Sequence, residues 1–119
     1  MADIQLLGHP SSKATGKARR FFSERRVPVH YVDLRKRAPT PGELRKWIQR
    51  FGHEAMLDPT AKAYREQGLS YVSVGEDSWL ERMSADPTIL RLPLVRCGKE
   101  LAVGEDPVAW QRFVDAVKS

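Results

Sequence analysis

The segment PLVRCGKELAV, residues 93–103, indicates most directly how this chain folds. Its two halves are rich in apolar residues, and the dipeptide Gly98-Lys99 stands between them. Two such runs that flank a short, glycine-containing turn are typical of a β-hairpin. The segment therefore predicts two adjacent antiparallel strands.

A helix is expected after this hairpin. Asp106 is suited to cap it, and Pro107 is suited to its first position, where no backbone N–H is needed. The apolar residues that follow repeat at the spacing of one helix face: Ala109, Trp110, Phe113, Val114 and Val117. We therefore predict a C-terminal amphipathic helix.

The first part of the chain has the pattern of a strand, a helix and a second strand. Residues 4–7 form a short apolar run, and the β-rich residues 29–34 form another. Between them, a helical pattern begins at Ser11 or Ser12 and stops before Val27. Because strand–helix–strand connections cross over in a right-handed sense, these residues predict a parallel βαβ unit.

The middle of the chain is predicted to be a helical insertion. Its first helix has a capping-box signal, with Thr40 as the cap and Glu43 three residues later, and it is expected to end at Gly52. The apolar stripe of this helix consists of Leu44, Trp47, Ile48 and Phe51.

Two further helices are expected in the insertion. One is predicted to open at Asp58 and to close near Gly68. The other is predicted to be capped by Asp77 or Ser78 and to end before Asp86. Their apolar residues have ordinary core spacing, and none of these stripes indicates a cofactor site.

Together these elements predict an α/β fold of the thioredoxin-like class. The βαβ unit and the hairpin would share one mixed four-stranded sheet, with the helical insertion and the C-terminal helix packed around it. The chain has 119 residues, of which 41% are hydrophobic and 29% charged. This size and composition suit a single globular domain over residues 1–119.

Composition also excludes several classes of protein. The single cysteine excludes an internal disulfide framework and a redox cycle that closes a disulfide within one chain. No apolar run approaches the roughly 20 residues of a membrane span, so no membrane partner is expected. The N-terminus has no basic segment followed by a long apolar stretch, so we expect a cytoplasmic protein.

The net charge of +5 arises in the first half, where basic residues gather between Lys13 and Arg50. One interpretation is a solvated helix face followed by a basic loop. The other is a surface for an acidic protein partner that includes Arg35, Lys36 and Arg37. Direct nucleic-acid binding is not expected, because the chain has no zinc, helix-turn-helix or RNA-binding motif.

Motifs along nearly the whole chain resemble one known family. They are LGHPSS (7–12), KARRFF (17–22), VDL (32–34), TPGEL (40–44), AYREQGL (63–69), DPTILRLPLV (86–95), and Gly98-Lys99 leading to Val103-Gly104. Their order and spacing resemble the arsenate reductase-like (ArsC/Spx) branch of the thioredoxin-fold proteins. The resemblance implies a thioredoxin-like fold with a cis peptide bond before Pro93.

The resemblance also implies where a reductase site would lie. Family enzymes attack arsenate with a cysteine in the turn between the first strand and the first helix, and the aligned residue is Ser12. The family's oxyanion-binding arginines align with Thr60, Leu92 and Glu105. Arg91 stands one residue before position 92. Because a shift of one residue near a strand turns a side chain to the opposite face, Arg91 does not directly replace the arginine missing there.

We interpret Ser12 as a helix cap. A serine hydroxyl needs a base to become nucleophilic, and no carboxylate in the turn is placed to orient the nearby His9. Serine, moreover, cannot perform thiol redox chemistry. We expect at most a weak anion-binding or ligand-binding site, made of Ser12 and Lys13 at the start of the helix together with Arg91 and Pro93.

The other candidate residues are interpreted as structural. His9, His30 and His53 are scattered without the spacing of metal ligands, so no metal is expected. Cys97 lies in a predicted strand and is interpreted as an inert residue of that strand.

Two functions from different classes remain. In the first, the chain has lost the catalytic cysteine and the oxyanion-binding arginines and is a non-catalytic binding or regulatory module without a cofactor. The resemblance includes Spx members, which bind RNA polymerase, so by analogy the partner of this chain would be a similar acidic protein. In the second, it is an arsenate reductase-like thiol oxidoreductase, and glutathione or a glutaredoxin supplies the missing sulfur. The residues at positions 12, 60, 92 and 105 favour the first function.

Overall fold

The computed structural model describes residues 3–119, which form two compact units. The first unit contains the described residues up to Arg35 together with Leu92–Ser119, and the second is Lys36–Arg91. None of the helices in residues 3–119 has the length and apolar character of a membrane span. The expectation of a single domain over residues 1–119 stays a prediction.

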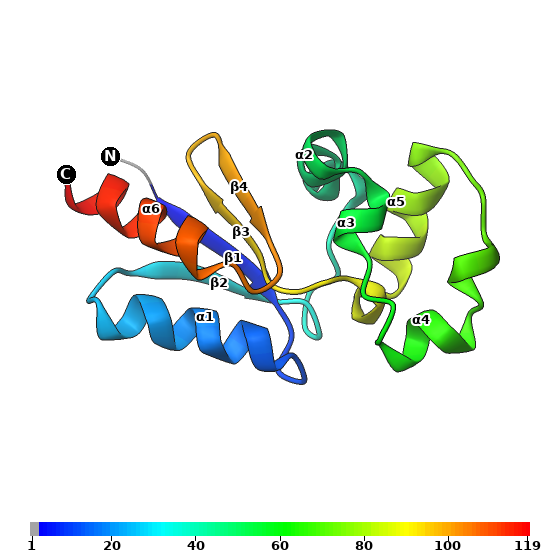
Figure 1. Cartoon of the computed structure of the whole chain (residues 1–119), viewed down its shortest axis with the longest axis horizontal. Helices are drawn as coiled ribbons and strands as arrows, with labels where there is room; N and C mark the ends of the chain where they lie inside the picture. The colour runs from blue at the N-terminus through cyan, green and yellow to red at the C-terminus, as the bar shows by residue number, and fades with distance from the viewer. Residues whose placement is uncertain (1–2) are drawn as a thin grey trace. The chain divides into compact units, whose positions relative to one another are not determined.

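The first unit contains a mixed four-stranded sheet in the order β2-β1-β3-β4 (Figure 1). Its strands are β1 (Ile4–Gly8), β2 (Val29–Asp33), β3 (Leu94–Cys97) and β4 (Glu100–Val103). Strand β1 is parallel to β2 and antiparallel to β3, and β3 pairs with β4 as a hairpin. The predicted parallel βαβ unit, the hairpin and the mixed sheet are confirmed.

Two helices of this unit share a core with one face of the sheet. They are α1 (Lys13–Glu24) and α6 (Pro107–Lys118). Phe22 of α1 and Trp110 of α6 pack in one cluster with Leu6 of β1 and its cross-strand partner Val95. Residues directly opposite each other in a sheet face the same side, which explains why this pair reaches the helices together. As predicted, Asp106 caps α6 by accepting the Ala109 N–H.

The second unit is helical (Figure 1). Its elements are α2 (Pro41–Phe51), α3 (His53–Met56), α4 (Lys62–Glu66), the 3₁₀ turn η1 (Leu69–Tyr71), α5 (Glu76–Ala85) and the 3₁₀ turn η2 (Pro87–Ile89). The predicted capping box is confirmed, because the Thr40 hydroxyl accepts the Glu43 N–H and the Glu43 carboxylate accepts the Thr40 N–H. Gly52 ends α2 with a φ of 84°, also as predicted.

Two helix starts in the second unit were predicted wrongly. Helix α4 begins at Lys62 and not at Asp58. The Asp58 carboxylate accepts the N–H of Thr60 and so forms a local turn before the helix. Helix α5 begins at Glu76 after Gly75, so neither Asp77 nor Ser78 is its cap. The carboxylate of Asp77 instead lies 3.1 Å from the guanidinium of Arg45. The one-turn helix α3 and the two 3₁₀ turns were not predicted.

Candidate functional site

The turn between β1 and α1 holds the residue that the family resemblance aligns with a nucleophile. The Ser12 N–H donates to the His9 carbonyl at 3.0 Å, which closes the turn. The Ser12 side-chain oxygen accepts the N–H of Thr15 at 3.1 Å. This hydroxyl therefore satisfies one of the backbone donors that a helix start leaves without a partner. The interpretation of Ser12 as a helix cap is confirmed.

The same turn depends on a close approach between Gly8 and Thr15. Thr15 is buried, and its side chain leaves no room for a β-carbon on Gly8. Its hydroxyl also lies 3.5 Å from the His9 nitrogen and accepts that N–H. A larger residue at position 8 would therefore displace Thr15, and with it the first turn of α1.

His9 is directed to Ser11 rather than to Ser12. Its Nδ1 accepts the Ser11 N–H at 3.1 Å and lies 2.8 Å from the Ser11 hydroxyl oxygen. Both contacts are local and exposed. A catalytic serine needs its base within hydrogen-bond reach and a third group that orients the base. Within residues 3–119, no hydrogen bond joins the His9 ring to the Ser12 side chain or to a carboxylate.

Pro93 lies at the same end of the sheet as this turn, because Leu7 at the end of β1 pairs with Leu94 at the start of β3. The peptide bond Leu92–Pro93 is cis, which confirms that prediction. The carbonyl of Pro93 accepts the Gly104 N–H at 2.9 Å. Leu92 is buried and apolar, so position 92 presents no positive charge to an anion.

Glu105, at another position aligned with a family arginine, forms an ion pair. Its Oε1 lies 3.2 Å from the Nζ of Lys17 on α1, and about half of each side chain is exposed. A negative charge at this position repels an oxyanion and also neutralises a nearby cation. The local electrostatics therefore oppose anion binding at Glu105.

The remaining aligned position, Thr60, lies in the second unit, and so does Arg91, the neighbour of position 92. The Thr60 hydroxyl donates to Asp58 Oδ1 at 2.6 Å. The Arg91 backbone N–H donates to the Met56 carbonyl, and its guanidinium donates to the Leu57 carbonyl at 3.3 Å. Both residues are therefore bound to their own unit, whereas Ser12, Lys13 and Pro93 belong to the other. A weak anion site made of Ser12, Lys13, Arg91 and Pro93 stays a prediction.

The basic residues Arg35, Lys36 and Arg37 have different surroundings. Arg35 pairs with Asp33 at 3.2 Å. Arg37 donates two hydrogen bonds of 2.9 Å to Glu43, and this pairing lowers the pKa of the Glu43 carboxyl to about 2. Lys36 forms no ion pair with any carboxylate in residues 3–119 and is exposed. Of the three, Lys36 therefore has the charge most available to a partner.

Cys97 is unsuited to thiol chemistry where it stands. It lies on β3 and is buried in the core shared with α1 and α6. Burial raises the pKa of its thiol, and the negative charges of Glu100 and Asp3 raise it further. Because the thiolate is the reactive form, this environment agrees with the interpretation of Cys97 as an inert strand residue.

The three histidines lie in separate places. His30 is exposed on β2, and the His53 ring stacks on Trp79 with their centroids 4.9 Å apart. Within the described part of the chain, no group of three or more His, Cys, Asp or Glu residues could hold a metal ion.

Comparison with known proteins gives the family. The profile of the ArsC family matches residues 7–113, which is most of the chain. The chain belongs to the ArsC family. No curated protein matches it.

Solved structures show the fold of this ArsC-family chain. The YffB (PA3664) protein is 22% identical, with a TM-score of 0.84 over 93% of this chain and 98% of its own. An ArsC family related protein from Bacteroides fragilis is 20% identical, with a TM-score of 0.84 over 93% and 97%. The arsenate reductase from Vibrio cholerae is 16% identical, with a TM-score of 0.81 over 94% and 98%. These similarities confirm the thioredoxin-like fold.

Sequence reasoning missed the roles of Gly8 and Thr15 in this ArsC-family turn. The predicted Ser12 cap bonds to the backbone N–H of residue 15, so it gave no signal for the role of the Thr15 side chain. The contact of Thr15 with Gly8 had no local signal either, since it depends on the angle at which α1 leaves the sheet. The pairing of Lys17 with Glu105 was also missed, because these residues are 88 positions apart.

Proposed function

We propose that this ArsC-family chain is a non-catalytic binding or regulatory module whose partner is an acidic protein. The observation that carries the proposal is Ser12, whose oxygen caps α1 at the position where thiol chemistry would need a sulfur. Arsenate reduction in this family passes through a bond between arsenic and an enzyme sulfur. The single cysteine of the chain is Cys97, which is buried on β3 with a raised thiol pKa.

The surroundings of the aligned arginine positions support the same proposal. Leu92 is apolar, Thr60 is hydrogen-bonded to Asp58, and Glu105 is negative. A site that holds an oxyanion needs charge-assisted donors, each of which contributes about 1.5–3 kcal/mol. These positions supply none, so restoring a sulfur alone would leave the anion poorly held.

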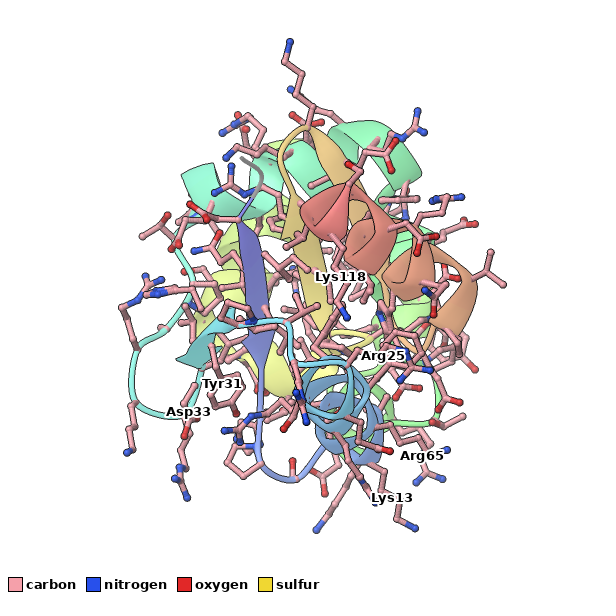
Figure 2. All side chains as sticks on the ribbon, turned by 90° about the vertical axis from the view of Figure 1, so that its left-hand side faces the viewer. Lys13, Arg25, Tyr31, Asp33, Arg65 and Lys118 are labelled. Carbon is pink, nitrogen blue, oxygen red and sulfur yellow. The ribbon has the colours of Figure 1, made fainter. Side chains whose placement is uncertain are left out.

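An acidic protein is the proposed partner because the net charge is +5 and several cations are exposed. Lys13 projects from the first turn of α1 (Figure 2), and Lys36 is exposed between Arg35 and Arg37. Such charges raise the association rate with a negative surface. The proposal includes a cytoplasmic location and no cofactor.

The first test is an arsenate reduction assay of the purified protein with glutathione and glutaredoxin. We expect no arsenite above the background without protein, while a family enzyme with a cysteine in the turn is active in the same mixture. Saturable reduction of arsenate would contradict the proposal and favour a reductase in which glutathione supplies the sulfur.

The second test is capture of a partner from host lysate with charge-reversed variants. The double variant Lys13→Glu/Lys36→Glu should lose the dominant partner. The control Lys62→Glu/Lys118→Glu changes the net charge by the same amount at exposed lysines elsewhere and should retain it. Equal retention by both variants would show that neither Lys13 nor Lys36 contributes to partner binding.

A further inference from the structure

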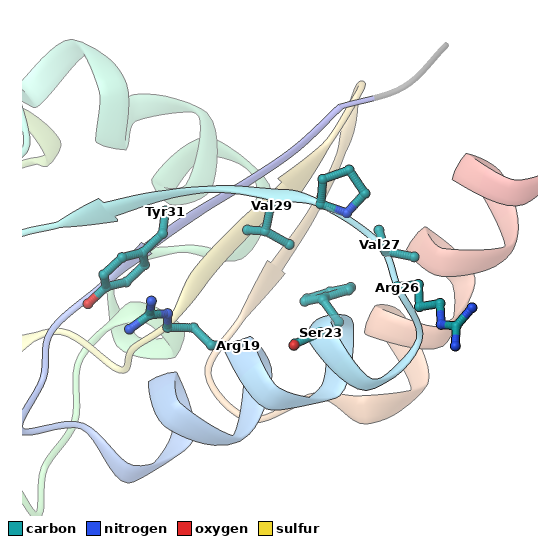
Figure 3. A pocket seen from close by; sticks show the side chains of 8 residues that line it. Arg19, Ser23, Arg26, Val27, Val29 and Tyr31 are labelled. Carbon is teal, nitrogen blue, oxygen red and sulfur yellow. The ribbon is translucent and has the colours of Figure 1, made fainter.

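A cavity lies between the C-terminal half of α1 and the start of β2, and Ser12 is not among the residues that line it (Figure 3). Its volume of about 420 Å³ falls in the range typical of ligand pockets. The residues that line it all belong to the first unit: Arg19, Phe22, Ser23, Arg26, Val27, Pro28, Val29 and Tyr31. The cavity is therefore complete within one compact unit.

The lining combines an apolar interior with positive charge. Phe22 and Val27 are buried, and Val29 is partly buried. Arg19 points toward Tyr31 in Figure 3, with its guanidinium carbon 4.0 Å from the ring centroid. No acidic residue is among those that line the cavity. It is thus suited to a group that has an apolar body and a negative charge.

Arg19 has unused capacity to bind an anion. In residues 3–119 it forms no ion pair, and its described partner is the Tyr31 ring. Stacking on an aromatic ring leaves the guanidinium N–H groups at its rim available to a carboxylate. At the other end of the cavity, Arg26 adopts a φ of 59°, which is uncommon for a residue other than glycine. Its side chain is directed away from Tyr31 (Figure 3).

The cavity adjoins an edge of the sheet. Strand β2 is the first in the order β2-β1-β3-β4, and within residues 3–119 it pairs with β1 alone. Natural edge strands often carry a lysine, a proline or an inward charge that prevents further pairing. Pro28 directly precedes β2 and Asp33 is its last residue, so these features stand only at the two ends of the strand and Val29–Val32 has none of them. Val29 and Tyr31, which line the cavity, alternate along this strand and share one face.

We propose that the edge of β2 and this cavity bind an extended acidic segment of a partner protein. The segment adds a strand to the sheet by main-chain hydrogen bonds to β2, places an apolar side chain in the cavity, and sets a carboxylate against Arg19. Main-chain pairing gives such complexes affinity, and pockets for alternate side chains give them specificity. The inference rests on the proposed function, because it names the surface and the kind of segment that a binding module would use.

The test uses a synthetic nine-residue peptide of alternating valine and glutamate as the probe. It is titrated into the whole ¹⁵N-labelled protein, and amide shifts are followed by NMR. We expect saturable shifts at Val29–Val32 and around Arg19. The same peptide N-methylated at every residue has no backbone N–H left to donate to a strand and should produce no such shifts.

Two variants test whether Arg19 binds the peptide at this site or acts only through the net charge of the protein. Arg19→Gln should weaken the peptide at least about tenfold, which corresponds to about 1.4 kcal/mol, and Arg19→Lys should restore part of the loss. The control Arg112→Gln removes one exposed arginine of α6 that does not line the cavity and should change the affinity less than about twofold. Circular dichroism and the dispersion of the amide spectrum verify that each variant is folded.

Several outcomes would overturn the inference. They are no binding at millimolar peptide, equal weakening by Arg19→Gln and Arg112→Gln, unchanged binding of the N-methylated peptide, or self-association of the protein through β2. If the peptide fails but a native partner is lost with Lys13→Glu/Lys36→Glu, the inference fails and the proposed function stands. Arsenate turnover by the unmodified protein would contradict the proposed function whatever the peptide does.

Discussion

Thiol chemistry needs a sulfur and surroundings that stabilise a thiolate. The turn before α1 and strand β3 each have one of these two. The turn has a helix N-terminus, an N–H directed at the Ser12 oxygen and a neighbouring lysine, Lys13, but no sulfur. Strand β3 has the sulfur of Cys97, but burial and the charge of Glu100 raise the pKa of that thiol. The difference shows that the reactivity of a thiol depends on its position in the fold as well as on the presence of a cysteine.

The largest effect concerns arsenate reduction by Ser12→Cys. This variant places a sulfur at the helix N-terminus but leaves Thr60, Leu92 and Glu105 without positive charge. Loss of two or three oxyanion contacts of about 1.5–3 kcal/mol each corresponds to roughly 10²–10⁶-fold in rate. We therefore expect turnover about 10³-fold below that of a family enzyme measured in parallel. Robust turnover would show that the cysteine alone is sufficient.

The next effect is the reactivity of the new thiol. In Ser12→Cys/Cys97→Ala, the thiol lies at a helix N-terminus beside Lys13, so its pKa should fall below the usual value of about 8.5. We expect alkylation by iodoacetamide at pH 7 about 100-fold faster than that of Cys97 in the unmodified protein, because the buried thiol reacts only when β3 opens. A labelling midpoint above pH 8.5 would show that the turn does not stabilise a thiolate.

A smaller effect concerns stability. Ser12→Ala removes the hydroxyl that accepts the Thr15 N–H and should lower the free energy of unfolding by about 1 kcal/mol. Ser11→Ala is the matched control, because the hydroxyl of this exposed serine contacts only the His9 ring nearby, and its cost should stay below about 0.5 kcal/mol. Urea denaturation followed by circular dichroism measures both. Equal costs would remove the evidence that the Ser12 cap stabilises α1.

The smallest effect concerns the ion pair between Lys17 and Glu105. Both side chains are about half exposed, so Glu105→Gln should change the free energy of unfolding by less than about 0.5 kcal/mol. In the Ser12→Cys/Cys97→Ala background, the same change releases Lys17 and should shift the alkylation midpoint slightly downward. The downward shift should shrink in high salt, because exposed charges are screened. An upward shift would contradict the electrostatic account of the turn.

Local patterns were enough to predict most of the fold. The caps Ser12, Thr40 and Asp106 were read correctly, because a capping side chain bonds to a backbone N–H only a few residues away. The hairpin around Gly98 was predicted for the same local reason. The helix starts at Asp58 and Asp77 were predicted wrongly, because an aspartate can cap a helix, close a turn or pair with an arginine. Which of these occurs depends on neighbours brought by the rest of the fold.

The candidate site was predictable only in its residue types. The sequence by itself determined that the turn has a serine and that positions 60, 92 and 105 have no basic side chain, because these are matters of identity and alignment. Only the tertiary structure decided that Glu105 pairs with Lys17 and that Thr15 packs against Gly8. It also decided that β2 is an edge strand and that two of its residues line a cavity. These features arise from packing and strand order, which no local propensity encodes. Their energies depend on burial and distance, and both exist only once the chain has folded.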